Sequence, residues 1–323
     1  MSTPHMFNKR PFLQTITPGV SVVPAGFWLA LTWSFFSAGY LYTAATTKTA
    51  LLGLLIGCIV SCIAPLPVAL TFMTAGLAPY IINEAVQQCS ADYEAFLNLG
   101  PGGTPSTFNG FKRITLLAWF GRINVLQAPP SIPGSGFLPS HFPVRTGERP
   151  IVGGIAPQRQ LDQHNSGEFF AYLVKSMHDF ASQQSNLRKG TSFLEKCTTA
   201  IFAHCDRINH PLSRTFGCEI THPHHVDGSL HVVLSPADIA TVISSGFGER
   251  HPLARDDWLW TAWFYATETR PPVPANLAFI YAPRTFDEVD TVMKIVKAGA
   301  MFVASSNDAG DGHTSCPHHQ PRR

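Results

Sequence analysis

Two long stretches without charged residues lie near the N-terminus and constrain the fold more than any other feature. No Asp, Glu, Lys or Arg occurs between Arg10 and Lys48, and none occurs between Lys48 and Glu84. A helix of roughly 20 apolar residues spans the hydrocarbon core of a bilayer. Each stretch is longer than that, and only 14% of the 323 residues are charged. The sequence therefore predicts a membrane anchor of two hydrophobic helices in residues 22–83, after a polar segment at 1–21.

The flanks of the two predicted spans, residues 22–42 and 50–82, indicate how the anchor is arranged. The first span is too long for the apolar core of a signal peptide, and a second span follows it directly. Pro65 and Pro67 remove backbone donors from the second span, which predicts a kink or a re-entrant hairpin there. Basic residues precede the first span and follow the second, whereas the turn between them holds only Lys48. The positive-inside rule then predicts that the catalytic domain after the anchor faces the cytosol. The membrane itself is expected to be that of the endoplasmic reticulum.

The composition excludes several classes of function. The net charge of +2 provides no basic field for a phosphate backbone, so no nucleic acid partner is expected. The seven cysteines form no Cys-x-x-Cys pair and are expected to be reduced thiols. A nucleophile elbow, a phosphate-binding loop and a dinucleotide fingerprint are all missing from the sequence, so nucleotide-dependent and serine hydrolase chemistry lack their signals.

The remainder of the chain reads as α+β, a small antiparallel sheet with flanking helices. A Gly- and Pro-rich connector is expected at 84–160, a catalytic domain at 161–304 and a disordered polar tail at 305–323. Within the connector, a short helix is expected at 91–99. Apolar periodicity and two capping boxes predict helices at 167–184, 236–245 and 286–296, and alternating patterns predict strands at 216–223, 229–234 and 277–282.

A cluster of histidines surrounds a predicted hairpin. With a central Asp-Gly turn, His224 stands opposite His231, and His222 shares their face because it lies two residues from His224. Leu230 and Val232 then point to the opposite face, toward the predicted helices. Three imidazoles on one face are candidates for a general base or for a facial set of metal ligands. The alternative for each histidine is an ordinary surface or capping role.

Two further motifs contain candidate site residues. Glu249 lies two residues before His251 on a glycine-bounded loop, where the carboxylate can orient the imidazole or take a proton itself. Tyr281 and Arg284 follow the last predicted strand and are candidates for holding an anionic substrate oxygen. A surface ion pair in the first motif and a carbonyl cap by Arg284 are the structural alternatives.

An aromatic stretch at 254–276 contains Trp258 and Trp260. These rings are candidates for the wall of an aromatic substrate pocket. The alternatives are contact with the membrane interface and hydrophobic cover for a long loop.

Together these motifs resemble the fungal luciferase family. The residues that carry the resemblance are Glu219-Ile-Thr-His-Pro-His224, Asp227-Gly-Ser-Leu-His231, Gly246-Phe-Gly-Glu-Arg-His-Pro-Leu-Ala254, Ile280-Tyr-Ala-Pro-Arg284 and, upstream, Asp92-Tyr-Glu-Ala-Phe-Leu97. The resemblance implies a membrane-anchored oxygenase of fungal secondary metabolism that uses no flavin or haem. Luminous members add dioxygen to a hydroxylated styrylpyrone, form a cyclic peroxide and lose carbon dioxide.

For this chain the resemblance implies a hydrophobic, polyketide-type or pyrone-like enol and dioxygen as reactants, with a histidine as general base and no cofactor. The chain departs from the family in its aromatic insertion after residue 254 and in its second predicted span. These departures leave the substrate open and favour a non-luminous member. A His-ligated metalloenzyme and a non-catalytic membrane protein that binds a hydrophobic metabolite remain as alternatives.

Overall fold

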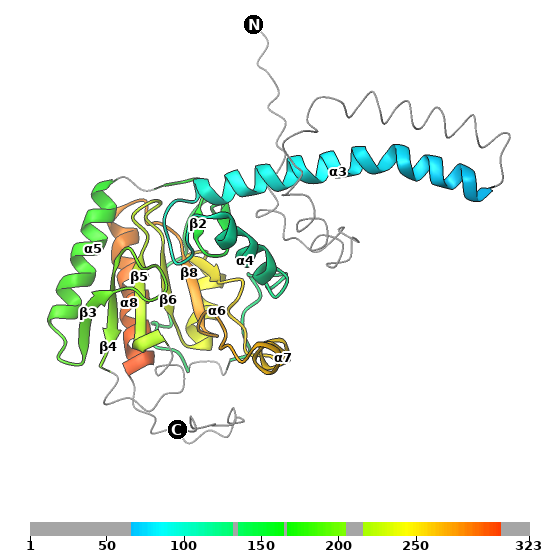
Figure 1. Cartoon of the computed structure of the whole chain (residues 1–323). Coiled ribbons are helices and arrows are strands. Elements are labelled where there is room, and N and C mark those ends of the chain that lie inside the picture. The colour runs from blue at the N-terminus through cyan, green and yellow to red at the C-terminus, as the bar shows by residue number, and fades with distance from the viewer. Residues whose placement is uncertain (1–65, 132–134, 165–166, 205–215, 305–323) are drawn as a thin grey trace, which may run out of the picture. The chain divides into compact units, whose positions relative to one another are not determined.

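A computed structural model describes residues 66–131, 135–164, 167–204 and 216–304 (Figure 1). The chain divides into two units, residues 1–98 and 99–323, which are described separately. The span predicted at 22–42, most of the first half of the second span and the tail at 305–323 lie outside the described residues. Of the helices that the structure does describe, none combines the length and the apolar character that crossing a bilayer requires.

The described part of the first unit is a single helix, α3, at Leu66–Asn98. It begins beside the two prolines of the second predicted span and contains Pro79. The short helix expected at 91–99 is therefore the C-terminal end of a longer helix. It ends just before Gly100, whose φ of 77° is the left-handed conformation that glycine favours.

The second unit is built on an antiparallel sheet of six strands in the order β3-β4-β5-β6-β8-β7. The strands are β3 (Leu187–Thr191), β4 (Thr199–Ala203), β5 (Glu219–Pro223), β6 (Leu230–Val233), β7 (Gly248–Arg250) and β8 (Leu277–Ile280). The 3-10 turn η2 (Phe216–Cys218) leads into β5. The predicted α+β class and the antiparallel sheet are confirmed, and β3, β4 and β7 are strands that the sequence pattern did not reveal.

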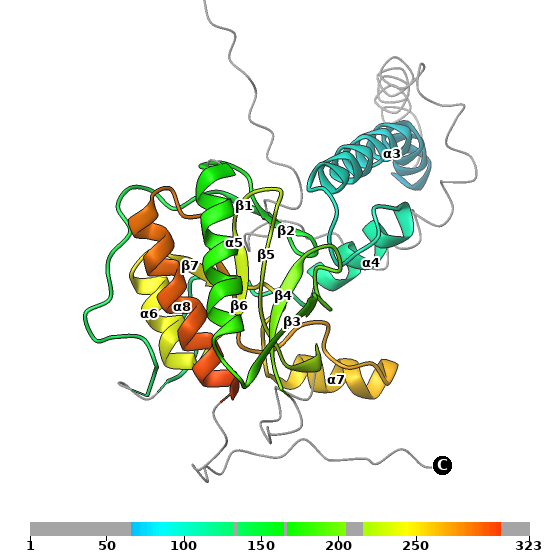
Figure 2. The same ribbon diagram turned by 90° about the vertical axis from the view of Figure 1, so that its left-hand side faces the viewer.

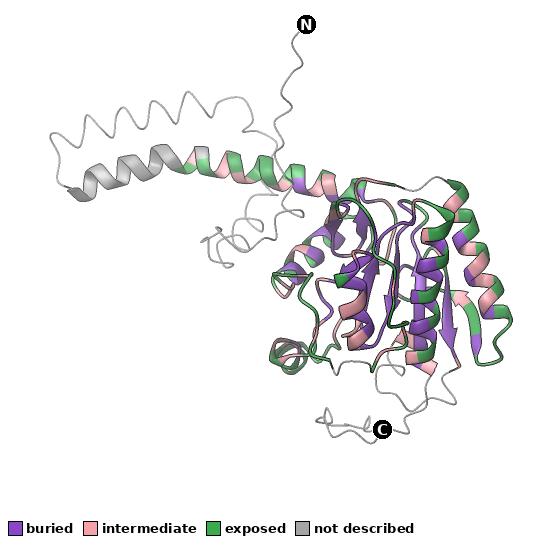
Figure 3. Cartoon of the chain, turned by 180° about the vertical axis from the view of Figure 1, so that it is seen from behind, coloured by how far each residue is buried: buried purple, intermediate pink, exposed green. Residues whose placement is uncertain are grey.

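Three helices cover one face of this sheet: α5 (Gly167–Ser182), α6 (Pro236–Ser244) and α8 (Phe286–Ala304) (Figure 2). The strands between the layers are largely buried, whereas the helices expose residues on their outer sides (Figure 3). A Cβ atom at Gly299 would lie 2.6 Å from Val232 Cγ1 and 2.8 Å from the Val233 carbonyl oxygen. Glycine at this position therefore allows α8 to pack directly on β6.

The opposite face carries the segments that the sequence suggested were loops. The predicted connector contains α4 (Phe108–Ala118) and a small hairpin of β1 (Val152–Gly154) and β2 (Gln158–Gln160). The aromatic stretch contains α7 (Trp258–Thr267), which begins at an Asp257 cap. Helices α4 and α7 lie away from α5, α6 and α8 (Figure 2).

The capping signals place the predicted helices correctly. The Ser235 hydroxyl accepts a hydrogen bond from the Asp238 backbone N–H at 3.1 Å, as the capping box requires. Gly246, just past the end of α6, has a φ of 82°.

Among the cysteines, Cys89 and Cys197 are free, but Cys218 is disulfide-bonded, so the expectation of reduced thiols throughout is wrong.

Candidate functional site

The register of β5 and β6 brings the predicted histidines together on one face. His222 pairs directly with His231, and Pro223 pairs with Leu230. The prediction that His224 stands opposite His231 is wrong by two residues, because the turn is wider than a two-residue hairpin. It is closed by the His224 N–H bond to the Ser229 carbonyl at 2.8 Å. A shift of two residues preserves the face, so the prediction of a shared histidine face is confirmed.

A β-bulge in β5 adds a carboxylate to this face. Ile201 pairs with Thr221 while the next residue, Phe202, pairs with Glu219, so Ile220 is an extra residue in the strand. The bulge turns Glu219 to the side of His222, where its Oε1 lies 2.7 Å from Nδ1 of the imidazole. Without the extra residue, positions 219 and 222 would point to opposite faces.

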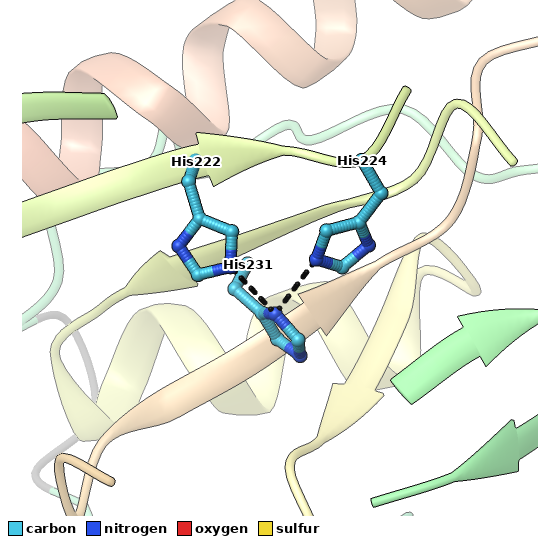
Figure 4. A group of neighbouring side chains, drawn as sticks. All are labelled: His222, His224 and His231. Atoms are coloured by element: carbon cyan, nitrogen blue, oxygen red, sulfur yellow. Dashed lines mark hydrogen bonds between the residues drawn. The ribbon is translucent and has the colours of Figure 1, made fainter. Parts of the chain in front are cut away.

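Figure 4 shows His222, His224 and His231, here called the three-histidine cluster. Nε2 of His222 lies 3.1 Å from Nδ1 of His231, and Nε2 of His224 lies 3.0 Å from the same atom. All three side chains are buried. Burial lowers the pKa of His224 and of His231 well below the usual value, with further lowering from neighbouring positive groups. His224 and His231 are therefore neutral at neutral pH and offer nitrogen lone pairs to a proton or a metal ion.

Each imidazole is held from behind by a separate polar partner. Glu219 holds His222 and is itself held by the Ser192 hydroxyl at 2.6 Å. Ser229 Oγ lies 2.8 Å from Nδ1 of His224. Nε2 of His231 lies 2.9 Å from the side-chain oxygen of Gln158 in β2. These contacts fix the orientation of all three rings.

A cavity of about 230 Å³ lies against the cluster. His222 and His231 line it directly, and so does His251, whereas His224 does not. The rest of the lining combines apolar residues with a few polar groups: Ile114, Leu117, Ile155, Leu253, Val273 and Leu277, with Arg113, Gln158, Glu195 and Lys196 among the polar ones. An apolar chamber with a few convergent polar groups is typical of a small-molecule site.

His251 has both ring nitrogens occupied by the backbone. Nε2 donates to the Ile155 carbonyl at 2.9 Å, and Nδ1 accepts from the Leu253 N–H at 3.0 Å. Burial lowers its pKa to about 4. Its ring lies 5.3 Å from that of His231, so it shapes the cavity wall and supports the neighbouring cluster.

Glu249 and Tyr281 form a pair on the same face of the sheet, away from the cavity lining. The Tyr281 hydroxyl donates to Glu249 Oε2 at 3.0 Å. Phe279, which pairs with both His231 and Glu249, lies between them in the strand order. Burial raises the pKa of Glu249 to about 7, against the opposing effect of the Tyr281 hydrogen bond.

The raised pKa makes stability depend on pH. A carboxyl that binds its proton more tightly in the folded than in the unfolded chain stabilises the fold below pH 4.5, and this contribution is lost as the pH rises through about 7. As the pH rises from acidic to mildly alkaline, we expect the free energy of unfolding of the wild type to fall by on the order of 3 kcal/mol more than that of Glu249→Gln. Urea unfolding of both proteins across this range measures the difference. Parallel curves would show that Glu249 titrates normally.

The other predicted substrate residues lie outside the described cavity lining. Arg284 pairs with Glu288 at the start of α8 and donates to the Thr146 carbonyl at 2.9 Å. Trp258 is 73% exposed on α7. Trp260 is buried, donates to the Leu253 carbonyl at 3.1 Å and stacks on Phe120. These side chains therefore contribute to the surface and the packing around α7 and α8.

Three polar residues of the site were not singled out from the sequence. Gln158 comes from the predicted connector, Ser192 from a loop before β4, and Glu219 from the bulge of β5. Glu219 belongs to a motif that resembles the family, which was the one signal available in the sequence. Gln158 and Ser192 have no local pattern, because they reach the site only through tertiary packing.

Comparison with known proteins agrees with the residues at this site. A family model described as a luciferase domain matches residues 217–299, which run from η2 into α8. The luciferase of Neonothopanus nambi is 29% identical over 230 residues, covering 66% of this chain and 80% of that protein. The luciferases of Armillaria gallica and Armillaria mellea are each 28% identical over 227 residues, covering 66% of this chain and 81% of each relative. No solved structure is significantly similar. The chain thus contains a luciferase domain and is similar over 66% of its length to fungal luciferases, and this domain holds the three-histidine cluster.

Proposed function

We propose that this protein is a membrane-anchored oxygenase that adds dioxygen to a polyketide-type or pyrone-like enol in fungal secondary metabolism. The observation that carries the proposal is the convergence of three buried imidazoles, two of which, His222 and His231, line a small, largely apolar cavity. The relatives are named luciferases, which supports a small-molecule substrate and dioxygen as reactants.

The cluster supplies the basic group that such a reaction needs. An unprotonated nitrogen of His222 or His231 accepts the proton of the enol, and the imidazoles and Gln158 hold the resulting anion. The enolate carbon then forms a bond to dioxygen, which is reduced to a peroxide while the substrate is oxidised by two electrons. Because the enolate supplies both electrons, this step needs no flavin or haem.

Oxygen incorporation tests the proposal. We expect purified full-length protein to consume dioxygen with a hydroxylated pyrone or related enol, and the product to carry label from ¹⁸O₂. Val273→Phe should lower kcat/KM because Val273 lines the cavity, whereas Trp258→Ala should leave it unchanged. Binding of these compounds without oxygen uptake would instead support a non-catalytic binding protein. Equal kcat/KM losses in both variants would contradict the assignment of the cavity.

The membrane anchor is the second part of the proposal. It is supported by the two uncharged stretches that end at Lys48 and Glu84. We expect the intact chain to sediment with membranes and to require detergent for release, since salt and alkali remove only peripheral proteins. Recovery of the uncleaved chain in the supernatant after high-speed centrifugation would contradict the anchor.

Two features bear on which side of the membrane the domain lies, and they favour opposite sides. The basic residues around the predicted spans favour a cytosolic domain. The disulfide at Cys218 is typical of an oxidising compartment such as the lumen. Protease digestion of sealed microsomes separates the two: a cytosolic domain is degraded, and a lumenal domain is protected until detergent is added.

A further inference from the structure

The hydrogen-bond partners of the three-histidine cluster determine which ring nitrogens carry hydrogen. A carboxylate only accepts, so Nδ1 of His222, at 2.7 Å from Glu219, carries the hydrogen. The oxygen of the Gln158 amide also only accepts, so Nε2 of His231 carries the hydrogen. In the neutral form of each ring, the other nitrogen has a free lone pair.

The third ring is fixed in the same way through a hydroxyl. Ser229 donates its proton to Asp227 Oδ2 at 2.8 Å, so its oxygen accepts from Nδ1 of His224 at 2.8 Å. Nε2 of His224 is then unprotonated. The three nitrogens that face one another at 3.0 and 3.1 Å therefore have no hydrogen to share. A positive ion between them would satisfy all three lone pairs at once.

The spacing of these nitrogens suits one metal ion. Nitrogens of imidazoles bind zinc at about 2.0–2.1 Å, so two ligands at tetrahedral or octahedral angles are about 2.9–3.4 Å apart. The three ligand atoms all lie within 4.8 Å of one another. Two of the three separations, 3.1 and 3.0 Å, already lie in the range that a common ion requires.

The surroundings also match those of a metal site. Metal-binding imidazoles characteristically donate their other nitrogen to a carboxylate, a carbonyl or a similar acceptor. Here Glu219 stands behind His222, and Asp227 stands behind His224 through Ser229. Both carboxylates are buried, so a dication at the cluster balances their charge. The cavity along His222 and His231 leaves room for further ligands.

We propose that His222, His224 and His231 bind a divalent first-row transition metal ion, with its remaining coordination positions open to the cavity. Three neutral imidazoles suit zinc, iron, cobalt or copper and do not suit magnesium or calcium, which prefer oxygen ligands. The role of the ion rests on the proposed function: in that reaction it would hold the enolate oxygen of the substrate. With the ion bound, the imidazole lone pairs are engaged, so the ion would replace the imidazole base of the metal-free mechanism: coordination would lower the pKa of the enol, and its proton would pass to water.

Metal binding is measured directly on the full-length protein in detergent. After dialysis against a chelator, the protein is titrated with Co²⁺, whose visible absorption reports the ligand geometry, and bound metal is counted by mass spectrometry. We expect one equivalent in the wild type, loss of that equivalent in His231→Ala, and retention in His225→Ala, because His225 is exposed outside the cluster. Mg²⁺ should not compete.

A second variant keeps the test valid if His231→Ala fails to fold. Glu219→Gln preserves all three ligands and removes only the carboxylate behind His222, so we expect about 10- to 100-fold weaker metal binding. Co²⁺ should also raise the Tm of the wild type, because it binds the folded chain. Failure of the wild type to bind Co²⁺, or equal affinity in wild type and Glu219→Gln, overturns the site.

The outcomes for the metal and for the proposed function are separable. Stoichiometric metal without oxygen uptake on any enol supports the site and counts against the oxygenase. Full oxygenase activity in chelated protein, unchanged by added metal, overturns this inference and leaves the proposed function standing.

Discussion

Replacing either His224 or His231 by alanine is expected to lower turnover by about 100-fold or more, the scale of a lost general acid or base. His231 has the largest effect, because its Nδ1 contacts both other rings and its side chain lines the cavity. His224 does not line the cavity, so its loss acts through the cluster, by removing the contact that orients His231 and one ligand of the proposed metal ion. Oxygen uptake with the same enol measures both variants.

The neighbouring His225 provides the control for this prediction. It is adjacent in sequence but exposed, so His225→Ala should keep wild-type turnover. Circular dichroism and thermal unfolding establish that each variant is folded. If folded His224→Ala and His231→Ala both retain full activity, the cluster only supports the sheet and the assignment of the site is wrong.

Replacing Glu195 by alanine is expected to lower the free energy of unfolding by about 3–5 kcal/mol, the usual cost of leaving a buried charge without its partner. Glu195 forms a buried ion pair with Arg159, whose guanidinium also donates to the Pro101 carbonyl at 2.5 Å. The pair joins β2 to the loop at 192–197, which lines the cavity and contains Ser192. Urea unfolding measures the loss.

An exposed ion pair in the same unit serves as the matched comparison. Lys175 and Asp179 lie four residues apart on α5, with an N–O distance of 2.6 Å and side chains 72% and 55% exposed. Solvent screens an exposed pair of this kind, so Asp179→Asn should change stability little. Similar losses for both variants would mean that Arg159 finds a new partner or water when Glu195 is removed.

Local sequence patterns predicted those parts of the site that depend on short-range geometry. The alternation of β5 and β6 placed three histidines on one face even though the predicted register was off by two residues, because a strand repeats its faces every second residue. The caps of α6 and α8 were predicted for the same reason, since a cap involves residues only a few positions apart.

Residues that act through long-range contacts could not be predicted in this way. His251 had the appearance of a catalytic base beside Glu249, but the structure engages both of its nitrogens with the backbone of Ile155 and Leu253. Trp258 had the appearance of a pocket wall, but α7 turns it to the outside. In each case the deciding neighbour is a backbone or an element whose position the local pattern does not encode.

The sequence by itself determined the resemblance to fungal luciferases, the α+β class, the histidine face and the two uncharged N-terminal stretches, because these features depend on composition, periodicity and short motifs. Only the tertiary structure decided that Glu219 joins His222, since an extra residue in β5 is visible only against the register of β4. It also decided that Gln158 reaches His231 across 73 positions of sequence. Packing of β2 and α4 onto the open face of the sheet forms the cavity, and that packing arises from the sum of many apolar contacts that no local segment specifies.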